Sequence, residues 1–168
     1  MSESVIAIII SAAALCIVLL NRFFPRKKEV KEEPAKPSFN TIPLQLQAYE
    51  RLALFCERIA IPNLISRNNQ PMATAQEMRA LLTEHIKQEF EYNASQQIYV
   101  SKLTWEAVRN LRDQSLLIIN QVGNVMPPDA MANDLNKKLL EVMMNHQDAA
   151  LHTIVADALN HEAKKLMS

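Results

Sequence analysis

The sequence contains almost no glycine, and this scarcity excludes several classes of fold and function. Its single glycine among 168 residues is Gly123. Tight hairpins, phosphate-binding loops and dinucleotide-binding turns depend on glycine, because glycine adopts backbone conformations that strain other residues. A β-rich fold, a P-loop and a Rossmann fingerprint are therefore disfavoured, and the G-x-S-x-G turn of a serine nucleophile cannot be formed.

Cysteine is scarce, and net charge is absent. Cys16 lies in an apolar run and Cys56 in a helical pattern, so no disulfide framework is predicted and a reducing compartment fits. The 18 basic and 18 acidic residues give a formal net charge of zero. A nucleic-acid-binding domain needs a strongly basic face, so we expect no nucleic-acid partner.

Metal-binding and catalytic patterns are also missing. A ferritin-like site needs Glu-x-x-His pairs, and no such pair occurs. His85 with Glu89, and Asp157 with His161, are each one helical turn apart, which is typical of surface pairs, whereas a zinc site needs three or four convergent ligands. Cys56 falls on the apolar face of its helix, where cysteine behaves as a small core residue. We therefore expect no metal, no cofactor, no catalytic residue and no enzyme activity.

The N-terminal part of the sequence contains a long apolar run. No charged residue occurs from Ser4 to Asn21. A helix over this run, extended by Phe23 and Phe24, approaches the ~30 Å thickness of the hydrocarbon core. We expect residues 1–24 to form a transmembrane anchor that contacts membrane lipid through residues 5–24.

A cleaved signal peptide is the main alternative to this anchor. Such a peptide needs a positively charged N-terminal region and a small-residue cleavage site, and neither is present. Four cations, Arg22, Arg26, Lys27 and Lys28, follow the run, and no lysine or arginine precedes it. The positive-inside rule predicts a single-pass protein of the inner (cytoplasmic) membrane, with its N-terminus outside and its C-terminal domain in the cytoplasm. Whether these membrane-proximal cations only set the topology or also bind anionic lipid stays open.

The remaining sequence divides into a linker and one domain. Residues 25–43 are charged and carry four prolines, which block a continuous helix, so a semi-extended linker is predicted. Residues 44–168 are long enough to build their own hydrophobic core. This part is predicted to be a compact cytoplasmic all-α domain.

Apolar residues spaced by three and four predict about five helices in this domain. Pro62 ends the first helix, and residues 61–66 are expected to pack down as a short helical turn. Gly123 or Asn124 is expected to supply a left-handed cap. The SLLII run at 115–119 predicts that the longest helix is central and buried on several sides. The first expected helix runs from Leu44 to Ala60 with Thr41 as its cap, and the second from the Thr74–Glu77 capping box to about Asn93. The third runs from Ser101 to about Gly123 and the fourth from Asp129 to His146. The last begins after a cap at Asn145 or Asp148.

Residues 92–100 are polar but uncharged and are the ambiguous part of the pattern. A single short strand has nothing to pair with, so a loop or an irregular helical turn is favoured. Within this stretch we select candidate partner-contact residues, because amphipathic tyrosines among amides are typical of interfaces. The alternative is that the tyrosines cover a core with their hydroxyls in water. The candidates are Tyr92, Asn93, Gln96, Gln97 and Tyr99.

Three blocks resemble a known group of proteins. They are LQAYERLALFCERIAIPNLISR at 46–67, EFEYNASQQIYVS at 89–101 and LLIINQ at 116–121. With an apolar run ahead of them, these blocks are similar to a family of small uncharacterised single-pass membrane proteins of Bacteroidetes bacteria. The resemblance covers essentially the whole chain and implies a bacterial inner-membrane protein with a helical domain. It implies no functional residues, because no activity is assigned to that family.

Two function hypotheses follow from these observations. The leading one is a non-enzymatic, membrane-tethered helical module that binds a protein partner, as an accessory subunit of a membrane complex. The alternative is a membrane-anchored domain that binds a small ligand or lipid. An apolar cavity lined by Trp105, Tyr99 and methionines would favour the alternative, whereas a wide exposed apolar patch over a solid core would favour partner binding.

Overall fold

The structure is a computed structural model that describes residues 40–145 and 148–167. The predicted anchor, the linker as far as residue 39, and the cations Arg22, Arg26, Lys27 and Lys28 lie outside the described residues. No helix among the described residues has the length and hydropathy needed to cross a membrane. Residues 40–168 form one compact unit.

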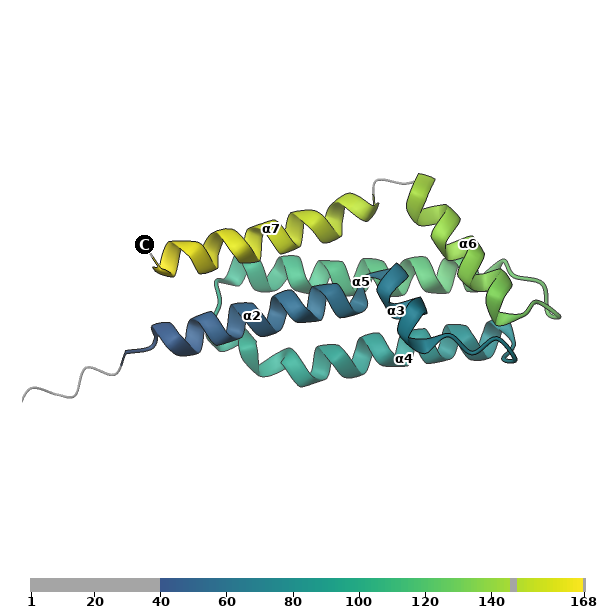
Figure 1. The fold of residues 1–168 in the computed structure, drawn as a ribbon, viewed down its shortest axis with the longest axis horizontal. Helices are drawn as coiled ribbons and strands as arrows, with labels where there is room; N and C mark the ends of the chain where they lie inside the picture. Colours follow the sequence, from purple (N-terminus) through teal and green to yellow (C-terminus); the bar gives the residue numbers. More distant parts are fainter. Residues whose placement is uncertain (1–39, 146–147, 168) are drawn as a thin grey trace, which may run out of the picture. The chain divides into compact units, whose positions relative to one another are not determined.

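Within residues 40–145 and 148–167 the chain forms six α-helices, one 3-10 helix and no β-strand (Figure 1). The predicted all-α class is confirmed, with one helix more than expected. The elements are α2 (Ile42–Ile59), α3 (Ile61–Asn68), α4 (Ala75–Asn93), η1 (Ala94–Ile98), α5 (Lys102–Asn124), α6 (Ala132–Asn145) and α7 (Asp148–Met167).

The four long helices α2, α4, α5 and α7 pack along one another, and α3 and α6 lie beside them (Figure 1). α2 packs most extensively on α7, and α4 packs on α5 and α6. α2 buries one face, as the spacing of its apolar residues predicts: Ala48, Tyr49, Leu52, Phe55, Cys56 and Ile59. These residues meet fully buried side chains from the other helices, including Met78, Leu82, Ile86, Val108, Ile119, Leu135, Leu139 and Leu159.

The predicted capping box at Thr74 and Glu77 is confirmed, and Thr41 occupies its predicted cap position without a side-chain bond. The Thr74 hydroxyl accepts a hydrogen bond from the Glu77 amide at 3.2 Å, and the Glu77 carboxylate accepts one from the Thr74 amide at 2.8 Å, which completes the capping box. The Ser101 hydroxyl accepts a hydrogen bond from the Thr104 amide at 3.1 Å. Thr41 makes no side-chain cap bond. The preceding Asn40 replaces it, because its side-chain oxygen accepts a hydrogen bond from the Ile42 amide.

The predicted left-handed cap at Gly123 or Asn124 is also wrong. Both residues lie inside α5, and no described residue has a positive φ. Gly123 is instead buried against the side chain of Arg79, which a Cβ at this position would overlap. The absent side chain lets Arg79 reach α5, where its Nε donates to Asn120 Oδ1 at 2.9 Å and its Nη1 to Asn124 Oδ1 at 2.7 Å. This glycine therefore serves close packing between α4 and α5.

A short bridge joins the loop before α4 to the loop before α6. The Ala75 amide donates to the Ala130 carbonyl, and the Ala132 amide donates to the Ala73 carbonyl, both at 2.9 Å. Because residues 130 and 131 take part in this bridge and the turn before it, α6 begins at Ala132 rather than at the predicted Asp129.

Residues 92–100 contain the irregular helical turn that was favoured from the sequence. α4 ends at Asn93, and η1 continues as a 3-10 helix from Ala94 to Ile98. Residues 61–66 were expected to form a short helical turn. They belong to α3, a complete helix of eight residues that is longer than predicted.

Candidate functional site

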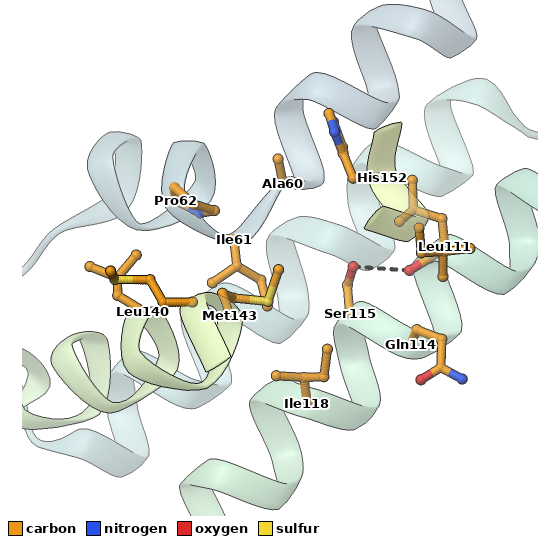
Figure 2. Close-up of a pocket in the computed structure, with 12 residues that line it drawn as sticks. Ala60, Ile61, Pro62, Leu111, Gln114, Ser115, Ile118, Leu140, Met143 and His152 are labelled. Atoms are coloured by element: carbon orange, nitrogen blue, oxygen red, sulfur yellow. Dashed lines mark hydrogen bonds between the residues drawn. The ribbon is translucent and has the colours of Figure 1, made fainter. Parts of the chain in front are cut away.

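An apolar cavity of about 570 Å³ opens between α3, α5, α6 and α7 (Figure 2). Its volume lies within the range of roughly 300–1,000 Å³ that is typical of small-molecule sites. Its lining residues come from the α2–α3 junction (Ala60, Ile61, Pro62), α5 (Leu111, Gln114, Ser115, Ile118), α6 (Leu140, Met143, Met144) and α7 (Leu151, His152).

The junction between α2 and α3 forms one wall because the helix breaks at Ala60. The ψ angle of Ala60 is 122°, which is extended rather than helical, and α3 restarts at Ile61. Pro62 fits the first turn of α3, because the backbone N–H that proline lacks has no intrahelical partner at that position. The small side chain of Ala60 fills little of the space that the break leaves between the helices.

A single face of α5 forms the opposite wall. Leu111, Ser115 and Ile118 are spaced by four and three residues, which places them on one side of the helix. The Ser115 hydroxyl donates to the Leu111 carbonyl at 2.9 Å, so its hydrogen-bonding capacity is used within α5 (Figure 2). A serine between larger aliphatic residues thus leaves room in the cavity without adding an unpaired donor.

The side formed by α6 is adaptable. Leu140 lies one turn before the adjacent Met143 and Met144, and the Met144 side chain is largely exposed to solvent. Thioether side chains are unbranched and flexible, so they adjust to ligands of different shape. This side could follow the contour of an aliphatic ligand.

The polar groups of the cavity are few. His152 Nε2 is buried, and it has no hydrogen-bond partner among the described residues. The nearest carboxylate oxygen, Glu57 Oε1, is 3.7 Å away, which is within ion-pair range but too far for a hydrogen bond. Gln114 also lines the cavity. Because His152 Nε2 has no accessible surface, this nitrogen is not available to a ligand in the cavity.

The cavity departs from the predicted lining in one respect. Two methionines line it, but Trp105 and Tyr99 do not. Trp105 instead stacks on Phe90, with 5.3 Å between ring centroids, and the Arg112 guanidinium carbon lies 4.0 Å from the centroid of Phe90. These three side chains hold α4 against α5, so the indole is not available to the cavity.

The candidate partner-contact residues do not form one exposed group. Tyr92 is 76% exposed and Gln97 is exposed, whereas Asn93 and Gln96 are buried. The Asn93 amide donates to the Glu89 carbonyl at 2.8 Å, and the Gln96 amide donates to the Ser95 hydroxyl at 3.1 Å. Tyr99 is partly exposed. The role of these residues in binding a partner stays a prediction.

Tyr92 adjoins a hollow that sequence analysis did not identify. Arg51, Leu54, Arg58 and Glu89 also line this hollow of about 290 Å³ between α2 and α4. Arg51 Nη2 donates to the Tyr92 carbonyl at 3.0 Å, and Arg58 Nη1 donates to Glu89 Oε1 at 2.9 Å. Leu54 is 53% exposed. The signal for this surface is Leu54 itself, which falls outside the buried face of α2.

Cys56 and the described histidines do not form a reactive centre. Burial raises the pKa of the Cys56 thiol to about 12, and the neighbouring Glu57 charge adds to this effect. Thiolate, the reactive form of cysteine, is therefore strongly disfavoured at neutral pH. In the described ranges, no three residues of the types His, Cys, Asp and Glu gather where they could hold a metal ion.

Comparison with known proteins gives a match to a family but not to a characterised protein. The matching family model is described as a family of unknown function (DUF7935), and it aligns with residues 2–166. Neither a curated protein nor a solved structure matches the chain.

Proposed function

Because the chain belongs to the DUF7935 family of unknown function, its function has to be inferred from its own residues, and we propose that it is a membrane-tethered, non-enzymatic domain that binds a small amphiphilic ligand. The observation that carries this proposal is the cavity of about 570 Å³ between α3, α5, α6 and α7. Its walls are mostly aliphatic, and Gln114, Ser115 and His152 are the polar residues among those that line it. Apolar walls with few polar groups are characteristic of small-ligand sites.

The lining specifies the chemistry of the ligand. Leu111, Ile118 and Met143 offer aliphatic and thioether surface, and no aromatic residue lines the cavity. A linear hydrocarbon chain fits such walls. The exposed Met144 marks the open side of the cavity, where a polar group at the end of the chain would stay in water. The proposed ligand class is therefore a single-chain lipid, such as a fatty acid.

The proposal also includes the membrane anchor in residues 1–24. The apolar run at 5–24 and the cations that follow it support a single span in a bacterial inner membrane, with the helical domain on the cytoplasmic side. A domain held at the membrane is close to single-chain lipids, and tethering raises its effective concentration near them.

The test is binding of a fluorescent fatty acid to the full chain in detergent-free nanodiscs. Leu140→Trp places a large ring at the cavity, where Leu140 is already partly exposed. Leu117→Trp is the matched control, because Leu117 is a partly exposed leucine of α5 that does not line the cavity. We expect Leu140→Trp to weaken binding at least about tenfold, because the indole occupies space that the ligand needs and so displaces several of its apolar contacts, and Leu117→Trp to leave it unchanged. Absence of saturable binding, or equal effects of the two variants, would refute the proposal.

A second candidate function is binding of a protein partner through the surface formed by Arg51, Leu54, Arg58 and Tyr92. The specific observation in its favour is that Leu54 and Tyr92 are exposed beside two arginines. Tyrosine and arginine are enriched among residues that dominate protein interfaces. Such a chain would act as an accessory subunit of a membrane complex.

The two candidates are separated by crosslinked pull-downs of the full chain from native membranes. If this surface binds a partner, Tyr92→Ala removes a stoichiometric protein from the pull-down, and Leu140→Trp does not. Recovery of the same protein with both variants would exclude this surface as its binding site.

A further inference from the structure

One end of the helical domain combines exposed apolar side chains with an excess of lysine. α2 begins there, and η1, the start of α5 and the end of α7 lie at the same end (Figure 1). Hydrogen bonds tie these segments together: the Glu162 carboxylate of α7 accepts from the Tyr49 hydroxyl at 2.7 Å and from the Ser101 hydroxyl at 2.8 Å. We call this surface, formed by residues 40–47, 92–103 and 163–167, the basal end.

Large apolar side chains of the basal end are exposed. Ile98 is 73% exposed, Leu103 76% and Met167 64%, and Ile42 is also exposed. They come from η1, α5, α7 and α2, so the apolar character belongs to the end of the bundle and not to the face of one helix. Tyr99, a residue type enriched where a membrane meets water, is partly exposed among them.

The three segments of the basal end are basic: they contain Lys102, Lys164 and Lys165 and no aspartate or glutamate. Two carboxylates lie just outside them. Glu106 is 3.8 Å from Lys102 Nζ in an exposed pair, which weakens but does not cancel the charge of that lysine. Glu162 accepts hydrogen bonds from Tyr49 and Ser101. At the opposite end, residues 120–134 contain Asp129 and Asp134, and Arg79 of α4 donates to Asn124.

We propose that the basal end docks on the surface of an anionic lipid bilayer. Its apolar side chains enter the interfacial region, and its lysines approach the lipid phosphates. A bilayer surface accepts an apolar tip with cations beside it, and Glu162, the carboxylate that joins the segments, is only partly exposed and already accepts hydrogen bonds from Tyr49 and Ser101.

The place where the described chain starts supports this occupant. Asn40 leads into α2 at the basal end, and residues 25–39 connect Asn40 to the apolar run near the N-terminus. The proposed function places this run in the membrane, and the docking proposal rests on that anchor. A linker of this length reaches roughly 50 Å when fully extended. This length is sufficient for the basal end to reach the surface of the bilayer in which the anchor is proposed to lie.

The test measures which end of the domain touches lipid in the reconstituted full chain. A fluorophore is attached at Leu103→Cys or, as the matched control, at Val125→Cys, since these side chains are 76% and 74% exposed at opposite ends of α5. Both variants carry Cys16→Ala, and the buried Cys56 remains. The vesicles contain phosphatidylcholine with or without phosphatidylglycerol, and a lipid with a spin-labelled headgroup quenches fluorophores that reach the surface.

We expect strong quenching at position 103 and little at position 125 in vesicles that contain phosphatidylglycerol. Lys102→Gln combined with Lys164→Gln should lower the ratio of docked to undocked domains about thirtyfold. The control pair Lys137→Gln and Lys138→Gln removes equal charge from α6 and should not change this ratio. Circular dichroism verifies that each variant is folded.

Equal quenching at the two positions would overturn the proposal. It would also be overturned if quenching at position 103 were unaffected by the lysine substitutions and by omission of phosphatidylglycerol, because the linker alone would then explain the proximity. Extraction of the membranes with alkaline carbonate tests the anchor separately. If the chain is released, it has no anchor, and both the proposed tether and the docking are refuted. A retained chain without lysine-dependent quenching refutes the docking alone.

Discussion

Replacement of Tyr49 by phenylalanine tests how α2, α5 and α7 are held together. The Tyr49 ring is buried on α2, and its hydroxyl donates to Glu162 Oε2 of α7 at 2.7 Å. Ser101, the N-cap of α5, donates to the other oxygen of the same carboxylate. Tyr49→Phe keeps the packed ring and removes one hydrogen bond to a charged acceptor.

The expected loss follows from this geometry. Hydrogen bonds to charged groups contribute about 1.5–3 kcal/mol. Glu162 is only partly buried, so water can reach its carboxylate once the tyrosine hydroxyl is gone. We therefore expect a loss near the lower end, about 1.5 kcal/mol of the free energy of unfolding.

Urea denaturation of residues 40–168, followed by fluorescence of Trp105, measures this loss. Tyr92→Phe is the matched control, because the Tyr92 side chain is 76% exposed and its hydroxyl is accessible to water. A double-mutant cycle of Tyr49→Phe with Glu162→Gln isolates the coupling between the two side chains. A loss no greater than that of Tyr92→Phe, or a coupling energy of zero, would refute the assigned role of this hydrogen bond.

Three further predictions concern pH, a helix cap and the buried thiol. Burial acts to raise the pKa of Glu162, but hydrogen bonds from Thr104, Tyr49 and Ser101 outweigh this effect and lower the pKa. The stability that this carboxylate contributes is therefore present above its unfolded-state pKa. It is lost as the pH falls through the folded-state pKa. Burial and the bond to Glu162 raise the pKa of Tyr49 from 10.0 to about 12, so its contribution is lost as pH rises through that interval. Denaturation across pH should show both losses in the parent and neither in the Tyr49→Phe, Glu162→Gln variant, and a parent profile as flat as that of the variant would contradict them. Thr74→Ala should lower the free energy of unfolding by about 1 kcal/mol through loss of the capping box, more than Thr41→Ala at an exposed position without a side-chain cap bond, and an equal effect would argue against the cap. Cys56 in a Cys16→Ala chain should resist maleimide in native buffer and react fully in denaturant, because its thiol is buried and its pKa is raised to about 12; rapid native labelling would show that this part of the core opens readily.

Most of the helices could be predicted because their signals are local. The buried face of α2 follows from the spacing of six apolar residues, and the start of α4 follows from Thr74 and Glu77. Gly123 was misassigned because a glycine near the end of a helix is typical of a cap, whereas here it admits the Arg79 side chain from another helix. The start of α6 was misplaced for a related reason, since a bridge to a distant loop occupies the residues before it.

The cavity could not be predicted from helical patterns. It exists because four segments distant in sequence leave space between them, and the only local trace of that space is Ser115 within a run of larger aliphatic residues. Trp105 was a reasonable choice for a cavity wall, since it lies on the inner side of α5, but the neighbour that it meets is Phe90. Periodicity shows which side of a helix is buried, but not which side chains it is buried against.

The bridge between the loops before α4 and α6 has a consequence for how the domain opens. Two hydrogen bonds, from Ala75 to Ala130 and from Ala132 to Ala73, join the loops at one end of the α4–α5 hairpin, and η1 with residues 99–101 joins the two helices at the other. The α4–α5 hairpin is thus held together at both of its ends. Neither helix can separate from the domain without breaking one of these closures, so α4 and α5 should exchange their amide hydrogens as a single cooperative unit.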